Sequence, residues 1–156
     1  MNRLFIRESQ GRLTSAAGNP IDKVNIAVTG LGQNVGTTFV ASSLAFYFAE
    51  KGNNLTFTQC LTPSRSNGLL YDAVAMDQRF HSRTFVDFYD LIKDGKPIKD
   101  KKNIESGINW RLPTPWDCEK KLDLDQEQKS RLIQGARSQI CVYDFEVEED
   151  WDWTWT

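Results

Sequence analysis

Glycines and hydroxyl groups gather in one short stretch of the sequence, and their spacing suits the binding of an anion. Thr29–Gly36 carries three glycines, which allow a tight turn and a close approach of main-chain N–H groups to a ligand. Thr37 and Thr38 follow, and the hydroxyl of Thr38 could face a Mg²⁺ ion. Free N–H groups at the start of a helix, together with the positive end of the helix dipole, form a natural anion site.

The segments on either side of this loop are those that such a site needs. Val24, Ile26 and Val28 belong to a short β-branched run with the composition of a buried strand. Thr37–Lys51 is apolar on nearly every side and is followed by Gly52, so we expect a well-buried helix there. A strand, a glycine loop and a helix in this order predict an anion site where the helix begins.

The layout is that of a phosphate-binding P-loop, whose pattern is G-x-x-x-x-G-K-S/T. In this chain Gly36 is followed by Thr37 where the pattern has lysine, and Leu31 stands where the pattern has its first glycine. The lysine that reaches the β- and γ-phosphates is therefore absent. A cradle of main-chain groups and the hydroxyl of Thr38 remain.

The stretch from Val28 to Phe48 resembles the deviant Walker-A ATPases of the MinD/ParA group; it reads V-T-G-L-G-Q-N-V-G-T-T-F-V-A-S-S-L-A-F-Y-F. The family's loop reads K-G-G-x-G-K-T-T. Thr37 then takes the place of the P-loop lysine, Gly32 that of the signature lysine, and Thr38 matches the metal-binding threonine. The similarity is greatest to a lysine-less branch of the group.

This resemblance implies an α/β fold, a three-layer sandwich with a mostly parallel sheet that is P-loop NTPase-like and incomplete relative to the full family domain. It implies a pocket at the carboxyl ends of the strands, where open α/β sheets generally bind ligands. It further implies that ATP or ADP with Mg²⁺ is the cofactor, and that one set of residues holds the nucleotide or anion. This set is Gly30, Gly32, Gln33, Asn34, Val35, Gly36, Thr37 and Thr38.

The resemblance also implies a metal-binding pair, Thr38 and Asp144. The strand predicted at Gln139–Phe145 is apolar and contains Asp144 near its end. In the family the equivalent aspartate holds Mg²⁺ through water. The alternative is an ordinary aspartate at a strand end near solvent.

Departures from the family pattern predict that the chain has no catalytic residues. The two lysines are missing, and no acid stands at Gln59–Leu61, where the family has its catalytic aspartate. Gln59 could orient a water molecule, but glutamine is not a base. Phosphoryl transfer depends on positioned positive charge and an oriented nucleophile. We therefore expect a non-catalytic nucleotide- or anion-binding module, or a scaffold.

Two other functions stay open. The first is a nucleotide-dependent ATPase switch in which a partner or a second subunit supplies the missing cation, or in which Arg79 or Arg83 does so. The second is a structural or regulatory protein that keeps the fold and binds no nucleotide and no cofactor.

Length and composition indicate one globular domain of 156 residues with a net charge of −2. This charge argues against a general nucleic-acid binder, and no apolar run approaches the length of a membrane span. Three cysteines without C-x-x-C spacing, and the absence of an export signal, predict reduced thiols in the cytoplasm. A single histidine, His81, disfavours Cys/His catalysis and zinc binding.

The chain divides into three parts: an N-terminal extension or hairpin at 1–20, the degenerate P-loop α/β domain at 21–146, and an acidic, tryptophan-rich tail at 147–156. Within the domain we expect further helices and strands. The helices are expected at Gly68–Ala75, Thr84–Leu91 and Asp125–Arg137, and the strands at Leu55–Cys60 and Gly107–Leu112, with a connecting loop at Trp116–Cys118.

The tail carries Trp151, Trp153 and Trp155 at alternate positions. This period puts all three indoles on one face of an extended segment. Such an apolar face predicts contact with a protein partner, self-association, or coverage of a sheet edge that the incomplete domain leaves open.

Overall fold

The structure is a computed structural model that describes residues 23–32, 35–60, 68–74, 85–97, 103–120 and 124–145. Several predictions fall outside these ranges and are not addressed by the structure. They concern Gln33, Asn34, Arg79, His81, Arg83, the N-terminal extension and the tryptophan-rich tail.

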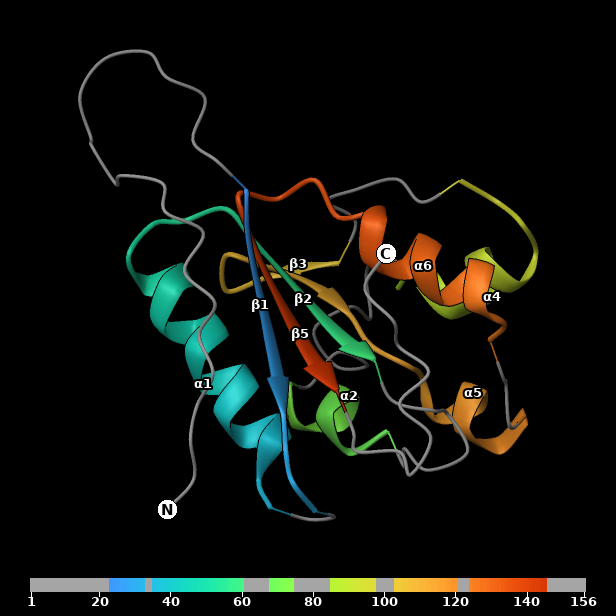
Figure 1. Ribbon diagram of the computed structural model, residues 1–156, viewed down its shortest axis with the longest axis horizontal. Coiled ribbons are helices and arrows are strands. Elements are labelled where there is room, and N and C mark those ends of the chain that lie inside the picture. Colours follow the sequence, from blue (N-terminus) through green and yellow to red (C-terminus); the bar gives the residue numbers. More distant parts are fainter. Residues whose placement is uncertain are drawn as a thin grey trace.

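The described strands form one mostly parallel sheet in the order β1-β5-β2-β4-β3 (Figure 1). Four of them, β1, β5, β2 and β4, run parallel, and the short β3 pairs antiparallel with β4. Their bounds are β1 Val24–Thr29, β2 Leu55–Cys60, β3 Ile104–Glu105, β4 Ile108–Arg111 and β5 Ile140–Phe145. The α/β class and the mostly parallel sheet predicted from the sequence are therefore confirmed.

Helices lie on both faces of the sheet. On one face, α1 and α2 pack against a core that contains Phe57 and Val142. On the other face, Ile133 of α6 packs against Cys141 and Tyr143, and α4 packs against α6. The helices are α1 Thr37–Glu50, α2 Leu69–Ala73, α4 Phe88–Lys93, α5 Pro115–Lys120 and α6 Gln126–Gln134.

Helix α1 occupies the predicted residues, but the prediction that it is well buried is wrong. Among its residues, only Ala41 and Ala45 are buried. Phe39 is 75% exposed and Tyr47 is 54% exposed. The cause is geometric: a single sheet face covers one side of a helix, and apolar side chains on the other side remain in solvent whatever their hydrophobicity.

The start of α4 and the existence of α5 also differ from the sequence prediction. Helix α4 begins at Phe88 because the Asp87 carboxylate accepts a hydrogen bond from the N–H of Asp90 and caps the helix. The predicted loop at Trp116–Cys118 is helix α5. There Thr114 and Asp117 form a reciprocal cap, in which Asp117 Oδ2 accepts from Thr114 N and Thr114 Oγ1 accepts from Asp117 N.

Arg111 at the end of β4 is fully buried and holds α6 to the sheet. Its Nη1 donates to the Leu132 carbonyl at 2.9 Å, and its Nη2 donates to the Gly135 carbonyl at 2.8 Å. Its guanidinium lies 5.1 Å from the ring centroid of Phe88. A cation at the carboxyl end of a helix is favourable because it satisfies the last carbonyls and opposes the helix dipole.

Substitution Arg111→Met should lower the free energy of unfolding by about 2–4 kcal/mol, because the buried Leu132 carbonyl and the partly buried Gly135 carbonyl lose a charged donor. Urea unfolding followed by circular dichroism measures this. Arg137 is exposed, so Arg137→Met is the matched control and should change stability by no more than about 0.5 kcal/mol. Equal effects of the two substitutions would contradict the role given to Arg111.

Candidate functional site

The loop between β1 and α1 folds back on itself so closely that Gly30 has no room for a side chain. A Cβ atom at Gly30 would lie 2.4 Å from Val35 Cγ2 and 2.7 Å from Thr37 Oγ1. Both neighbours are β-branched side chains with restricted χ1 angles, so they cannot easily move away. The start of the loop is therefore packed against its end and against the first residue of α1.

The first turn of α1 presents main-chain donors to its surroundings. Gly36 caps the helix in the left-handed region, with φ of +84°, and Val40 N donates to Gly36 O at 3.1 Å. The cap makes no side-chain hydrogen bond, and the first turn contains no acidic residue. Helix N–H groups that precede this bond have no partner within the helix, and Val35 and Gly36 are exposed. An anion in solvent can therefore approach them.

Three strands bring their carboxyl ends to this same edge of the sheet. In the register of the sheet, Val28 of β1 lies beside Asp144 of β5, and Asp144 lies beside Gln59 of β2. Val28 and Val142 belong to the core under α1. Because side chains alternate along a strand, Asp144 and Gln59 lie on the α1 face as well. Asp144 has no exposed surface.

The structure thus brings most of the predicted site residues to one place. Gly30, Gly32, Val35, Gly36, Thr37 and Thr38 form the described part of the loop and the start of α1, whereas Gln33 and Asn34 lie outside the described residues. Asp144 lies on the same side of the sheet, one residue before the end of β5. Oxygen ligands from a threonine and an aspartate are of the kind that Mg²⁺ takes, so Thr38 and Asp144 fit this ion in their chemistry.

The buried cysteine and arginine near the carboxyl ends of β2 and β4 take no part in this site. Burial, together with the charge of Asp144, raises the pKa of the Cys60 thiol well above its usual range. Cys60 is therefore a neutral core residue and not a nucleophile. Arg111 pairs in register with Thr58, whose face is opposite to α1, and its guanidinium is held by α6. It does not replace the missing lysine of the loop.

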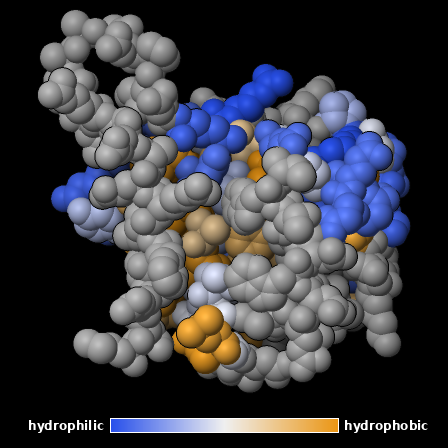
Figure 2. Space-filling model, in the orientation of Figure 1, coloured by the Kyte–Doolittle hydropathy of each residue, from blue (hydrophilic) through white to orange (hydrophobic). Residues whose placement is uncertain are grey.

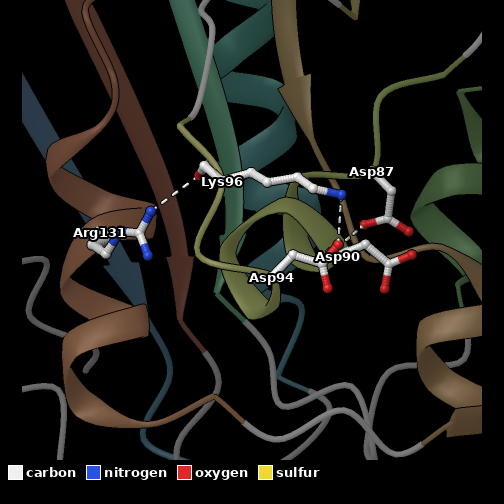
Figure 3. Close-up of polar contacts among 5 residues, drawn as sticks. All are labelled: Asp87, Asp90, Asp94, Lys96 and Arg131. Carbon is white, nitrogen blue, oxygen red and sulfur yellow. Dashed lines mark hydrogen bonds and ion pairs between the residues drawn. The ribbon is translucent and has the colours of Figure 1, made fainter.

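An acidic cluster that the sequence prediction missed lies where two helices begin. One oxygen from each of Asp87, Asp90 and Asp117 falls within 4.8 Å of the others. Figure 3 shows Asp87, which caps α4, beside Asp90 of its first turn. It also shows Lys96, whose ammonium pairs with Asp94 and whose carbonyl accepts a hydrogen bond from Arg131. Burial raises the pKa of Asp87 to about 6, and the charges of Asp117 and Asp90 add to this, against the opposing hydrogen bond from Asp90 N.

Helix capping accounts for this acidic cluster. Asp87 caps α4 and Asp117 closes the cap of α5, so two adjacent helix starts bring their carboxylates together. The sequence contained a signal for it: Thr114-Pro115-Trp116-Asp117 has a capping threonine, a proline at the first helical position and an acid two residues later.

Comparison with known proteins gives no assignment for this site: no family model, no curated protein and no solved structure matches the chain. Within the described residues, no helix is both long and apolar enough to cross a membrane.

Substitution Gly30→Ala should distort the loop and lower the melting temperature, at a cost of about 1–3 kcal/mol for overpacking. Gly32→Ala is the control, because its Cβ would lie 3.7 Å from Val35 Cγ1, which is an ordinary contact. Calorimetry of both variants measures the difference. A Gly32→Ala variant that is destabilised as much as Gly30→Ala would show that the close approach at Gly30 does not hold the loop.

Substitution Asp87→Asn should make stability less dependent on pH. Because the pKa of Asp87 rises from 3.8 to about 6 on folding, the folded state holds a proton that the unfolded chain has released, and stability falls as pH rises through this interval. Asparagine keeps the cap without the charge. Urea unfolding between pH 4 and pH 7 should therefore show a shallower decline in the variant. Asp87→Ala, which lacks both the charge and the cap, should be less stable than Asp87→Asn by about 1 kcal/mol at each pH. An unchanged slope in Asp87→Asn would contradict the raised pKa.

Proposed function

We propose that this chain binds the phosphate groups of a nucleotide at the loop between β1 and α1 and does not hydrolyse them. The observation that carries the proposal is the close approach at Gly30, which closes the loop onto the first turn of α1. The first N–H groups of α1, which have no partner within the helix, lie beside this close approach. The absence of a capping side chain and of acids in the first turn leaves these groups open to an anion.

The position of Asp144 supports the relationship to MinD/ParA-like P-loop domains, which is part of this proposal. The strand before the loop pairs with the strand that contains Asp144, and that strand pairs in turn with β2. A nucleotide bound at the loop would then have Thr38 and Asp144 on the α1 side as candidate contacts for Mg²⁺. When bound, this ion would offset the charge of the phosphates.

The non-catalytic character follows from the side chains. The loop from Gly30 to Thr38 contains no lysine, and the buried Arg111 is held on the other sheet face. Gln59, at the level of Asp144, is 4% exposed and has an uncharged amide. Main-chain dipoles can bind phosphate in its ground state, but positioned charge is what lowers the barrier to phosphoryl transfer.

Thermal unfolding with ATP, ADP or GTP and Mg²⁺ tests the proposal directly. A ligand that binds only the native state raises the melting temperature by mass action, and the rise continues to grow as the ligand concentration exceeds the dissociation constant. We expect a rise with nucleoside di- and triphosphates at millimolar concentration, without release of phosphate. No rise with any of them would favour a structural or regulatory protein that binds no nucleotide.

Substitution Thr37→Lys provides a gain-of-function prediction. A lysine here restores the P-loop charge, and a charge-assisted hydrogen bond to phosphate should raise nucleotide affinity about tenfold. Calorimetric titration measures the dissociation constant. Ser43 is an exposed residue further along α1, so Ser43→Lys adds the same charge away from the loop and should leave affinity nearly unchanged. Equal gains would mean that general charge attraction, and not the loop, binds the nucleotide.

A second candidate is a nucleotide-dependent switch that a second subunit completes. One observation favours it: apolar side chains around the loop are exposed, with Leu31 at 89%, Val35 at 58% and Phe39 at 75%. Figure 2 shows hydrophobic surface at the lower end of the molecule, where Figure 1 places the connection between β1 and α1. A subunit seated there could supply a cation. Turnover per molecule that rises with protein concentration would favour this function over simple binding.

A further inference from the structure

Helix α1 carries a band of apolar side chains that the sheet does not cover. The main described contacts of α1 are with strands of the sheet, and Ala41 and Ala45 are its buried residues (Figure 1). Ser43 lies two residues, or about 200° of rotation, from each of them, so it marks the middle of the opposite side. The side chains around it are apolar and 39–75% exposed: Phe39, Val40, Phe46 and Tyr47. These five residues are called the outer face of α1.

The outer face of α1 has the same spacing when it is followed from either end. Phe39 and Val40 precede Ser43 by four and three residues. Phe46 and Tyr47 follow it by three and four residues. A two-fold axis at the serine would therefore set the first apolar pair of one copy against the second apolar pair of another. An isologous dimer interface requires self-complementarity of this kind.

The two ends of α1 complement each other in charge. Glu50 is exposed in the last turn, which has no basic residue, so its carboxylate lies at the negative end of its own helix dipole. Lys51 follows the helix, with its ammonium 5.6 Å from the ring centroid of Tyr47. At the other end, Gly36 caps without a side-chain hydrogen bond, and the first turn has no acid. Gly36 and Glu50 are each seven residues from Ser43, so the same two-fold axis brings each glutamate to the helix start of the other copy.

We propose that a second copy of this chain covers the outer face of α1, in an antiparallel pair of α1 helices related by a two-fold axis at Ser43. The small serine side chain allows a close approach where the helices meet, and the aromatic side chains pack on either side of it. Each Glu50 then lies beside the first N–H groups of the other copy's α1. Apolar burial in the middle and opposite charge at both ends favour the same register.

The symmetry of this face favours a second copy over another protein, because a copy necessarily presents the same spacing in reverse order. A parallel pair would instead set Glu50 beside Glu50 and align two helix dipoles in the same direction. Fourteen residues of helix are about 21 Å long. A contact of this length buries less surface than most stable dimers do, so we expect reversible association with a Kd on the order of 10 µM.

This pairing does not rest on nucleotide binding by the loop. A phosphate group would approach the same N–H groups as Glu50 of the second copy, because both are anions that favour a helix start. Association is therefore measured in a buffer without phosphate and without nucleotide.

Disulfide cross-linking of the 156-residue chain tests the pairing. Where helix axes lie 8–10 Å apart, facing Cα atoms are about 3.5–5.5 Å apart, which overlaps the range of a disulfide. Ser43→Cys should therefore form a covalent dimer on mild oxidation. Glu50→Cys should not, because the two positions lie about 21 Å apart along the antiparallel pair. Both variants carry Cys118→Ser, since Cys118 is a half-buried thiol, and Cys118→Ser alone gives the background.

Sedimentation velocity tests the contribution of charge, at concentrations from about 1 to 100 µM around the expected Kd. Glu50→Gln should weaken association about tenfold, because both copies lose a contact between the carboxylate and a helix start. Glu127 is an exposed acid on α6, on the other face of the sheet. Glu127→Gln removes the same charge there and should leave the Kd unchanged.

Three outcomes would overturn the proposal. In the first, the chain stays monomeric throughout this range, which means that the outer face of α1 serves another occupant. In the second, Ser43→Cys forms no more covalent dimer than the background. In the third, Ser43→Cys and Glu50→Cys form it equally, which excludes the antiparallel pair centred on Ser43.

Discussion

The parallel pairing of β5 between β1 and β2 is the constraint on which the rest of this structure depends. It places the carboxyl ends of three strands at one edge, although these strands are far apart in the sequence. The loop after β1, Gln59 of β2 and Asp144 of β5 meet there for that reason alone. Without this pairing the loop would be an isolated helix start, and Asp144 would lie elsewhere.

The two faces of the sheet use charge differently. On one face the buried cation Arg111 serves as the carboxyl-terminal cap of α6. Its guanidinium donates hydrogen bonds to carbonyl oxygens at the end of that helix. On the other face the described residues place main-chain donors and a helix dipole at the loop, but no cationic side chain. Dipoles fixed in position can hold a phosphate at a helix start. This division of charge is the physical reason that the function proposed for this chain is phosphate binding without hydrolysis.

The sequence predicted the local elements well because their signals are local. Strand, loop and helix at Val24–Glu50 followed from β-branched residues, glycines and an apolar run. The role of Arg111 could not be predicted, because its partners lie 21 and 24 residues further along the chain. The exposure of Phe39 and Tyr47 could not be predicted either, since it depends on how much of α1 the sheet covers. The meeting of Asp87 with Asp117 likewise depends on the packing of α4 beside α5.

The measurement that tests the central claim most directly is a titration of the ¹⁵N-labelled chain with ADP and Mg²⁺, followed by the amide chemical shifts. If main-chain groups at the start of α1 bind the phosphates, the amides of Gly30, Gly36, Thr37 and Thr38 should shift together along one saturable curve. The amides of α6 on the far face should stay in place. Saturable shifts that are confined to residues away from this loop, or no saturable shift at all, would contradict the account.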